Sequence, residues 1–299
     1  MPSSNPALSD AVFTRETKAA RPGTFEPSFD SPASELPPNL FTPGATPGAP
    51  PAAPPHQGTS PFDTGDTMRL SGTLSATAVI FGFLLVAAWF GWHAVTVVTG
   101  KDTAGNTIVL SANFPPWIMV SMLVAFGLAM LTIFKPKTAR ITAPLYAVAE
   151  GVALGGISHF FNAQYNGIVL SAISGTFAVF AVMLVLFATR TIRVTDKLRS
   201  GIIAATLAVV LLYVVALVLR LFGVTMPLLN DSGPLGIGIS LLIIGIAAFN
   251  LLLDFDLIER GIAMKAPRYM EWYGAFGLVL TLVWLYLEML RLMAKLRSR

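Results

Sequence analysis

The chain has 299 residues, of which 54% are hydrophobic and 12% are charged, and its formal net charge is +4. A soluble domain carries about 25% charged residues, so this composition excludes an ordinary water-soluble core. The absence of cysteine excludes disulfides and thiolate metal sites, and the three histidines argue against a catalytic metal site built on several of them.

Residues 1–67 differ in composition from the rest of the chain. They hold 14 of the 21 prolines, with three basic and seven acidic residues, and residues 37–55 are rich in Pro, Ala and Gly. Such a segment buries too little apolar surface to offset its chain entropy. We predict a disordered or polyproline tail, with a docking arm for a partner as the alternative. No apolar run follows Met1, so we do not expect a signal peptide.

The remaining residues, 68–299, predict an all-α integral membrane domain. A helix needs about 20 mostly apolar residues to cross the hydrocarbon core, and continuous apolar runs favour helices over barrel strands. We predict a bundle of seven transmembrane helices, at residues 72–98, 117–134, 142–161, 168–189, 201–222, 235–258 and 271–293.

Basic residues between the predicted spans indicate the orientation. They cluster in the loops after the second, fourth and sixth spans, whereas the opposite loops carry few charges. The positive-inside rule therefore places these loops and the N-terminus in the cytoplasm, with the spans in the cell membrane. The same pattern explains the basic excess without any nucleic-acid partner.

The basic C-terminus (Lys295, Arg297 and Arg299) conflicts with an odd number of spans. Either this short tail crosses the membrane despite its charge, or the last hydrophobic segment re-enters the membrane without crossing it. The length of residues 271–293 favours seven spans.

Ionisable residues inside membrane spans are costly and often functional. Glu150 lies about 12 Å inside the third span, at 1.5 Å per residue from Thr142. Gly151 and Gly155 follow it with the G-x-x-x-G spacing that allows close helix packing. We therefore interpret the glycines as packing residues and Glu150 as a functional candidate.

The end of the sixth span carries a second polar group. Asn250 and Asp254 are four residues apart and share a helix face, whereas Asp256 is rotated about 200° from Asp254. One aspartate is then expected to face the bundle and the other the interface, unless both simply solvate the helix end. Glu271 begins the seventh span, where the helix dipole favours an acidic residue.

Glu150, Asn250, Asp254 and Glu271 are predicted to approach one cytoplasm-facing pocket, where the carboxyls would titrate as a coupled set. Hard cations prefer oxygen ligands, so this pocket predicts a pH-sensitive site that gates or binds a cation. Near the other end of the seventh span, we expect Glu288 and Arg291 to form an intrahelical ion pair. Arg220 is expected to snorkel or to pair with Glu288.

Three stretches, residues 150–158, 253–261 and 270–291, resemble the Bax inhibitor-1 superfamily, most closely its bacterial branch. The resemblance covers roughly residues 68–295 and leaves the proline-rich tail outside. It implies a seven-helix bundle with a central seventh helix and a pH-sensitive calcium leak controlled by two aspartates. Asp254 resembles the first aspartate and Arg291 the arginine near the end of the last span. Thr281, ten residues before Arg291, takes the place of the second aspartate, and threonine cannot titrate.

Two functions follow as expectations. The first is a pH-modulated cation leak, with Ca²⁺ bound near Asp254, no cofactor, and the lipid bilayer as its environment. The alternative, which the resemblance also allows, is a non-transporting regulator that binds a membrane protease or another stress-response partner. An enzyme is not expected, because no H-E-x-x-H or G-x-S-x-G motif is present and the histidines are dispersed.

Overall fold

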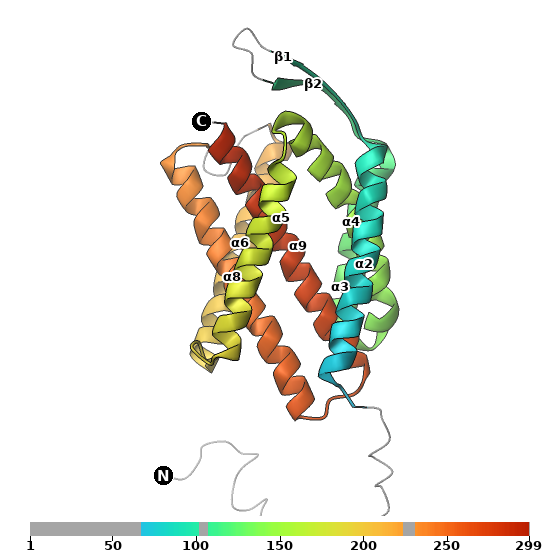
Figure 1. The fold of residues 1–299 in the computed structure, drawn as a ribbon, viewed down its shortest axis with the longest axis vertical. Coiled ribbons are helices and arrows are strands. Elements are labelled where there is room, and N and C mark those ends of the chain that lie inside the picture. The colour runs from blue at the N-terminus through green and yellow to red at the C-terminus, as the bar shows by residue number, and fades with distance from the viewer. Residues whose placement is uncertain (1–66, 102–106, 224–230, 299) are drawn as a thin grey trace, which may run out of the picture. The chain divides into compact units, whose positions relative to one another are not determined.

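A computed structural model describes residues 67–101, 107–223 and 231–298 (Figure 1). The predicted tail, residues 1–67, lies almost entirely outside them. The described elements are α2 (Leu70–Ala94), β1 (Thr96–Lys101), β2 (Thr107–Asn113), α3 (Pro116–Phe134), a short 3₁₀ turn (Pro136–Thr138), α4 (Ala139–Gln164), α5 (Ile168–Ala188), α6 (Asp196–Leu221), α8 (Pro234–Ala263) and α9 (Tyr269–Arg297).

The helices confirm the predicted fold class. Among the described residues, seven helices are long and apolar enough to cross a membrane, and they correspond one to one with the predicted spans. The first predicted span was too long, because α2 ends at Ala94 and residues 96–98 belong to β1. β1 pairs with β2 in an antiparallel hairpin, with Thr96 opposite Asn113 and a register shift between Val98 and Thr99.

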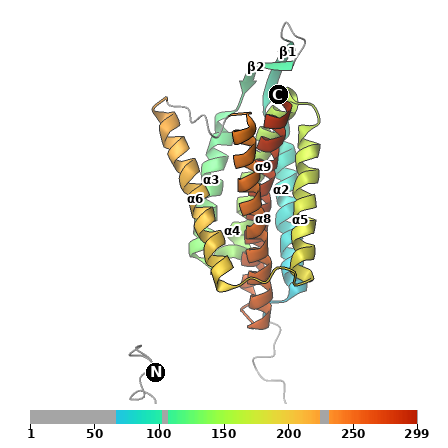
Figure 2. The ribbon, with the colours of Figure 1, turned by 90° about the vertical axis from the view of Figure 1, so that its left-hand side faces the viewer.

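Helix α9 is the central element of the bundle. It packs against α2, α4, α5 and α8, as the views in Figures 1 and 2 show. In its most apolar stretch 61% of the residues are buried within the protein, against 11% in α6, which lies at the edge of the bundle in Figure 2. Polar groups on α9 are therefore shielded from lipid by its neighbours.

Close contact between α2 and α4 depends on glycine. A Cβ atom at Gly151 would collide with the carbonyl oxygen of Leu84, and one at Gly155 with that of Ala88. On the facing helix, Gly91 is equally close to the carbonyl of Val152. The predicted packing role of the G-x-x-x-G spacing is thus confirmed, and its partner is α2.

Helix α9 is continuous from Tyr269 to Arg297. Its C-terminal end lies at the same end of the bundle as the β1–β2 hairpin and at the opposite end from the start of α2 (Figure 1). The start of α2 is instead joined to the α8–α9 loop, where the amide of Met68 donates to the carbonyl of Ala266 at 2.7 Å. The last segment therefore crosses the bundle and does not re-enter.

Candidate functional site

Asp254, on α8, faces the central helix. Its Oδ1 lies 3.2 Å from the position that a Cβ atom on Gly277 would occupy, so the carboxyl rests against the backbone of α9. The hydroxyl of Thr281 lies near the same carboxyl. Its Oδ2 is buried and has no hydrogen-bond partner among the described residues. The site therefore leaves one carboxyl oxygen unsatisfied inside a membrane helix bundle.

In the sequence, Thr281 takes the place of the second aspartate that the family resemblance implies, and in the structure it lies near Asp254. Gly277 and Thr281 are one turn apart, so both present the same face of α9 to Asp254. Thr281 is buried. The α8–α9 contact thus holds one carboxyl and one hydroxyl where the resemblance implied two carboxyls.

Asn250, one turn before Asp254, contacts a different helix. Its side-chain amide donates to the hydroxyl of Thr206 on α6 at 2.8 Å and to the carbonyl of Ile246 at 2.9 Å. Asn250 therefore ties α6 to α8 and does not share the environment of Asp254.

Asp256 faces away from the Asp254 site. It forms an ion pair with Arg260, one turn further along α8. This agrees with the prediction that the two aspartates lie on different faces of the helix. Asp256 therefore belongs to the polar end of α8 and not to the Asp254 site.

Glu271 has a structural environment. Its carboxylate is buried and accepts a hydrogen bond from the amide of Arg69 at 2.9 Å, with the Arg268 guanidinium 3.8 Å away. Arg69 precedes α2, so Glu271 satisfies an amide at the positive end of that helix as well as lying in the first turn of α9. Sequence spacing identified only the second of these roles.

Glu150 is half-buried on α4, one turn after Tyr146. No hydrogen bond or ion pair to its carboxyl is present among the described residues. Asn250, Asp254 and Glu271 thus contact different neighbours and do not share the predicted pocket, whereas a place for Glu150 in such a pocket stays a prediction. Consistent with this, no group of three or more His, Asp or Glu side chains among the described residues is placed to hold a metal ion.

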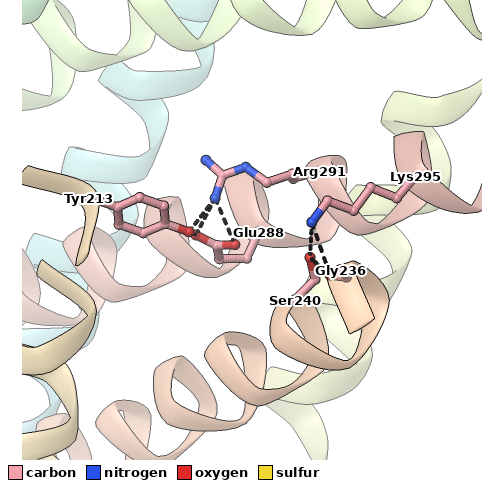
Figure 3. Close-up of polar contacts among 6 residues, drawn as sticks. All are labelled: Tyr213, Gly236, Ser240, Glu288, Arg291 and Lys295. Carbon is pink, nitrogen blue, oxygen red and sulfur yellow. Dashed lines mark hydrogen bonds and ion pairs between the residues drawn. The ribbon is translucent and has the colours of Figure 1, made fainter. Parts of the chain in front are cut away.

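The most extensive polar network lies around Glu288 on α9 (Figure 3). Glu288 is 1% exposed, and its carboxylate accepts the hydroxyl of Tyr213, on α6, at 2.6 Å. Arg291 donates to both carboxylate oxygens at 3.1 Å, also contacts the Tyr213 hydroxyl, and lies 5.0 Å from the centre of the Tyr213 ring. The expected Glu288–Arg291 pair is confirmed, but its partner from α6 is Tyr213 rather than Arg220.

Lys295, one turn beyond Arg291 on α9, makes a separate set of polar contacts with α8. Its ammonium group is buried and donates to the carbonyl of Gly236 at 3.0 Å and to the hydroxyl of Ser240 at 2.9 Å (Figure 3). The sequence placed Lys295 in an exposed basic tail. The signal that was missed is the pair Gly236 and Ser240, which lie one turn apart near the start of α8 and supply the two acceptors for the lysine.

This arrangement defines an integral membrane protein of seven helices, with buried polar contacts along the central one. The family model described as Bax inhibitor 1 like matches residues 5–298, and the chain belongs to that family. The match begins far earlier than residue 68, so the expectation that the tail lies outside the resemblance was wrong. Neither the curated proteins nor the solved structures gave a significant match. Membership of the bacterial branch stays a prediction.

Proposed function

We propose that the protein is a passive cation leak of the cell membrane, with Ca²⁺ as the first candidate ion, and that the Asp254 carboxyl controls its opening. The observation that supports the proposal is the buried, unpartnered Oδ2 of Asp254 at the α8–α9 contact. A charged carboxylate in such a place is costly unless it takes up a proton or a cation. Oxygen is the ligand that Ca²⁺ prefers.

Gating follows from the position of the carboxyl against the backbone of α9. The close approach of Asp254 to Gly277 means that a change in its charge acts directly on the packing of two membrane helices. A protonated carboxyl can donate a hydrogen bond, whereas an ionised one only accepts. Proton or cation uptake therefore favours different arrangements of α8 and α9, which is the requirement for a switch.

Thr281 makes this switch simpler than one with two carboxyls. Its hydroxyl can donate to an ionised Asp254 or accept from a protonated one, but it does not titrate. Two interacting carboxyls release protons in two macroscopic steps, whereas a single one gives one step. We therefore infer that flux follows a one-proton pH curve.

The test is Ca²⁺ flux into liposomes that hold the purified full chain, scanned over pH, with D254N, E150A and D256N alongside. D256N is the matched control, because Asp256 is a carboxyl of the same helix that pairs with Arg260. We expect pH-dependent flux that D254N abolishes or makes pH-independent and that D256N leaves unchanged. No flux above empty liposomes at any pH, from protein shown to be folded, would refute the leak.

A second candidate is a non-transporting regulator that binds a membrane protease or another stress-response partner. The presence of Thr281 in place of a second titratable group favours it. It predicts no flux and partner capture that depends on residues 1–67. That the protein is not an enzyme, and that its N-terminus is cytoplasmic, stay predictions under both candidates.

A further inference from the structure

A cavity of about 610 Å³ lies between α2, α4, α5 and α9, apart from the Asp254 site. Its back wall is fixed, because α2 and α4 meet there with no space for a side chain at Gly155. Its floor includes Leu282 and Val283 of the central helix, which are buried. α2 and α5 form its sides and carry an edge-to-face pair of Phe81 and Phe177, with ring centres 6.2 Å apart.

The chemistry of the lining favours hydrocarbon over a polar ligand. The hydroxyls of Ser158 and Tyr286 reach the cavity but bond to each other at 2.6 Å. The hydroxyl of Thr176 donates to the carbonyl of Ala172 at 2.8 Å. The remaining interior side chains are aliphatic or aromatic. The interior thus offers no unsatisfied hydrogen-bonding group to a polar molecule, whereas burial of apolar surface is favourable there.

Two tryptophans and a histidine lie together at one end of the cavity. Trp89, Trp92 and His93 line the cavity in the last turns of α2, just before the chain enters the hairpin. The rings of Trp89 and His93 lie 4.7 Å apart, and Trp92 packs on His159 at 4.9 Å. Tryptophan at the end of a membrane span is typical of the headgroup level, so this end faces the membrane surface.

The length of the cavity matches one leaflet. Phe81 and His93 mark its two ends on α2, and twelve residues of helix span about 18 Å at 1.5 Å per residue. Half of the hydrocarbon core is about 15 Å thick. We propose that this cavity binds one acyl chain of a phospholipid from the leaflet on the hairpin side, which enters between α2 and α5 and keeps its headgroup near Trp89 and His93.

The test uses the full chain in nanodiscs made with a phospholipid that carries a photoreactive diazirine midway along one acyl chain. After irradiation, cross-linked residues are located by mass spectrometry. Labels on Leu282 or Val283 are expected, because lipid outside the bundle does not reach these buried residues. Labels confined to exposed positions such as Val86 would overturn the proposal.

Matched variants separate the cavity from the general lipid surface. Ala88→Trp fills the cavity, whereas Val86→Trp adds the same side chain to α2 at a position that is 70% exposed and lies outside the cavity. A88W should reduce labelling of α9 several-fold, and V86W should not. Should A88W fail to fold, Ile173→Trp blocks the cavity from α5 instead. Equal labelling of α9 in a folded cavity variant and in V86W would also refute the site.

Discussion

The contact between Tyr213 and Glu288 should make a measurable contribution to the stability of the bundle. Tyr213→Phe removes one hydroxyl and keeps the ring beside the Arg291 guanidinium, so the cation–π contact at 5.0 Å survives. Glu288 is almost completely buried and accepts the hydroxyl at 2.6 Å. The substitution therefore removes both contacts of the hydroxyl, its hydrogen bond to Glu288 and its contact with the Arg291 guanidinium.

The expected magnitude lies near the upper limit for membrane proteins. Hydrogen bonds to charged groups contribute about 1.5–3 kcal/mol in soluble proteins, whereas helix-to-helix bonds in a membrane average about 0.6 and reach about 1.7 kcal/mol. Because Arg291 still satisfies Glu288 in the variant, we expect a loss of about 1–1.5 kcal/mol for Y213F.

The assay is reversible unfolding in bicelles, by steric trapping, with Thr206→Val as the matched comparison. Thr206 lies on the same helix as Tyr213, and its hydroxyl accepts a hydrogen bond from Asn250 of α8 at 2.8 Å. Because both of these partners are neutral, the loss of this hydrogen bond should cost about 0.6 kcal/mol. A double-mutant cycle of Y213F with Glu288→Gln isolates the part that depends on the charge. A cost for Y213F no larger than that for T206V, with no coupling to E288Q, would refute this account of the network.

Three further outcomes are expected. Lys295→Met removes the donor to Gly236 and Ser240 and should lower stability by about 1–2 kcal/mol in the same assay; an unchanged or higher stability would mean that burial of the charge outweighs its two bonds. Gly155→Ala forces a methyl group into the backbone of α2 and should cost about 3 kcal/mol or more, whereas Gly127→Ala, which has nothing within 4 Å, should have little effect; similar stabilities would contradict the close packing. Thr281→Asp places a second carboxyl beside Asp254 and should change the flux from a one-step to a two-step pH curve; a curve identical to that of the unchanged chain would show that residue 281 does not face the gating group.

The number and position of the helices were predictable because the bilayer imposes a minimum length on each apolar run. The error that assigned strand residues to a helix, at residues 95–98, has a physical reason. Val95, Val97 and Val98 are as apolar as the helix before them, so hydropathy alone continues the span. Valine and threonine also favour strands, and pairing with residues 107–113 decides the outcome. That pairing is not visible in a local window of sequence.

Polar contacts were predictable within one helix and not between helices. The Glu288–Arg291 pair follows from a spacing of three, which fixes both side chains on one face. The contacts of Glu288 with Tyr213, of Lys295 with Ser240, and of Glu271 with the start of α2 depend on which helices are neighbours. Sequence spacing contains no such information, and for this reason the prediction of one common pocket was wrong for its residues on α8 and α9.

The contacts of α9 nevertheless follow a regular rule. Thr281, Glu288 and Lys295 are seven residues apart, so they form one stripe along the helix, with a drift of about 20° per seven residues. This stripe meets Asp254 on α8, then Tyr213 on α6, then Ser240 on α8. A rotation of α9 that carries Thr281 away from Asp254 also strains the other two contacts, because the three residues belong to one rigid helix. In the leak proposed above, the charge of Asp254 would therefore be linked to the stability of the Glu288 and Lys295 contacts, and opening at Asp254 would require either that those contacts break or that α6 and α8 move with α9.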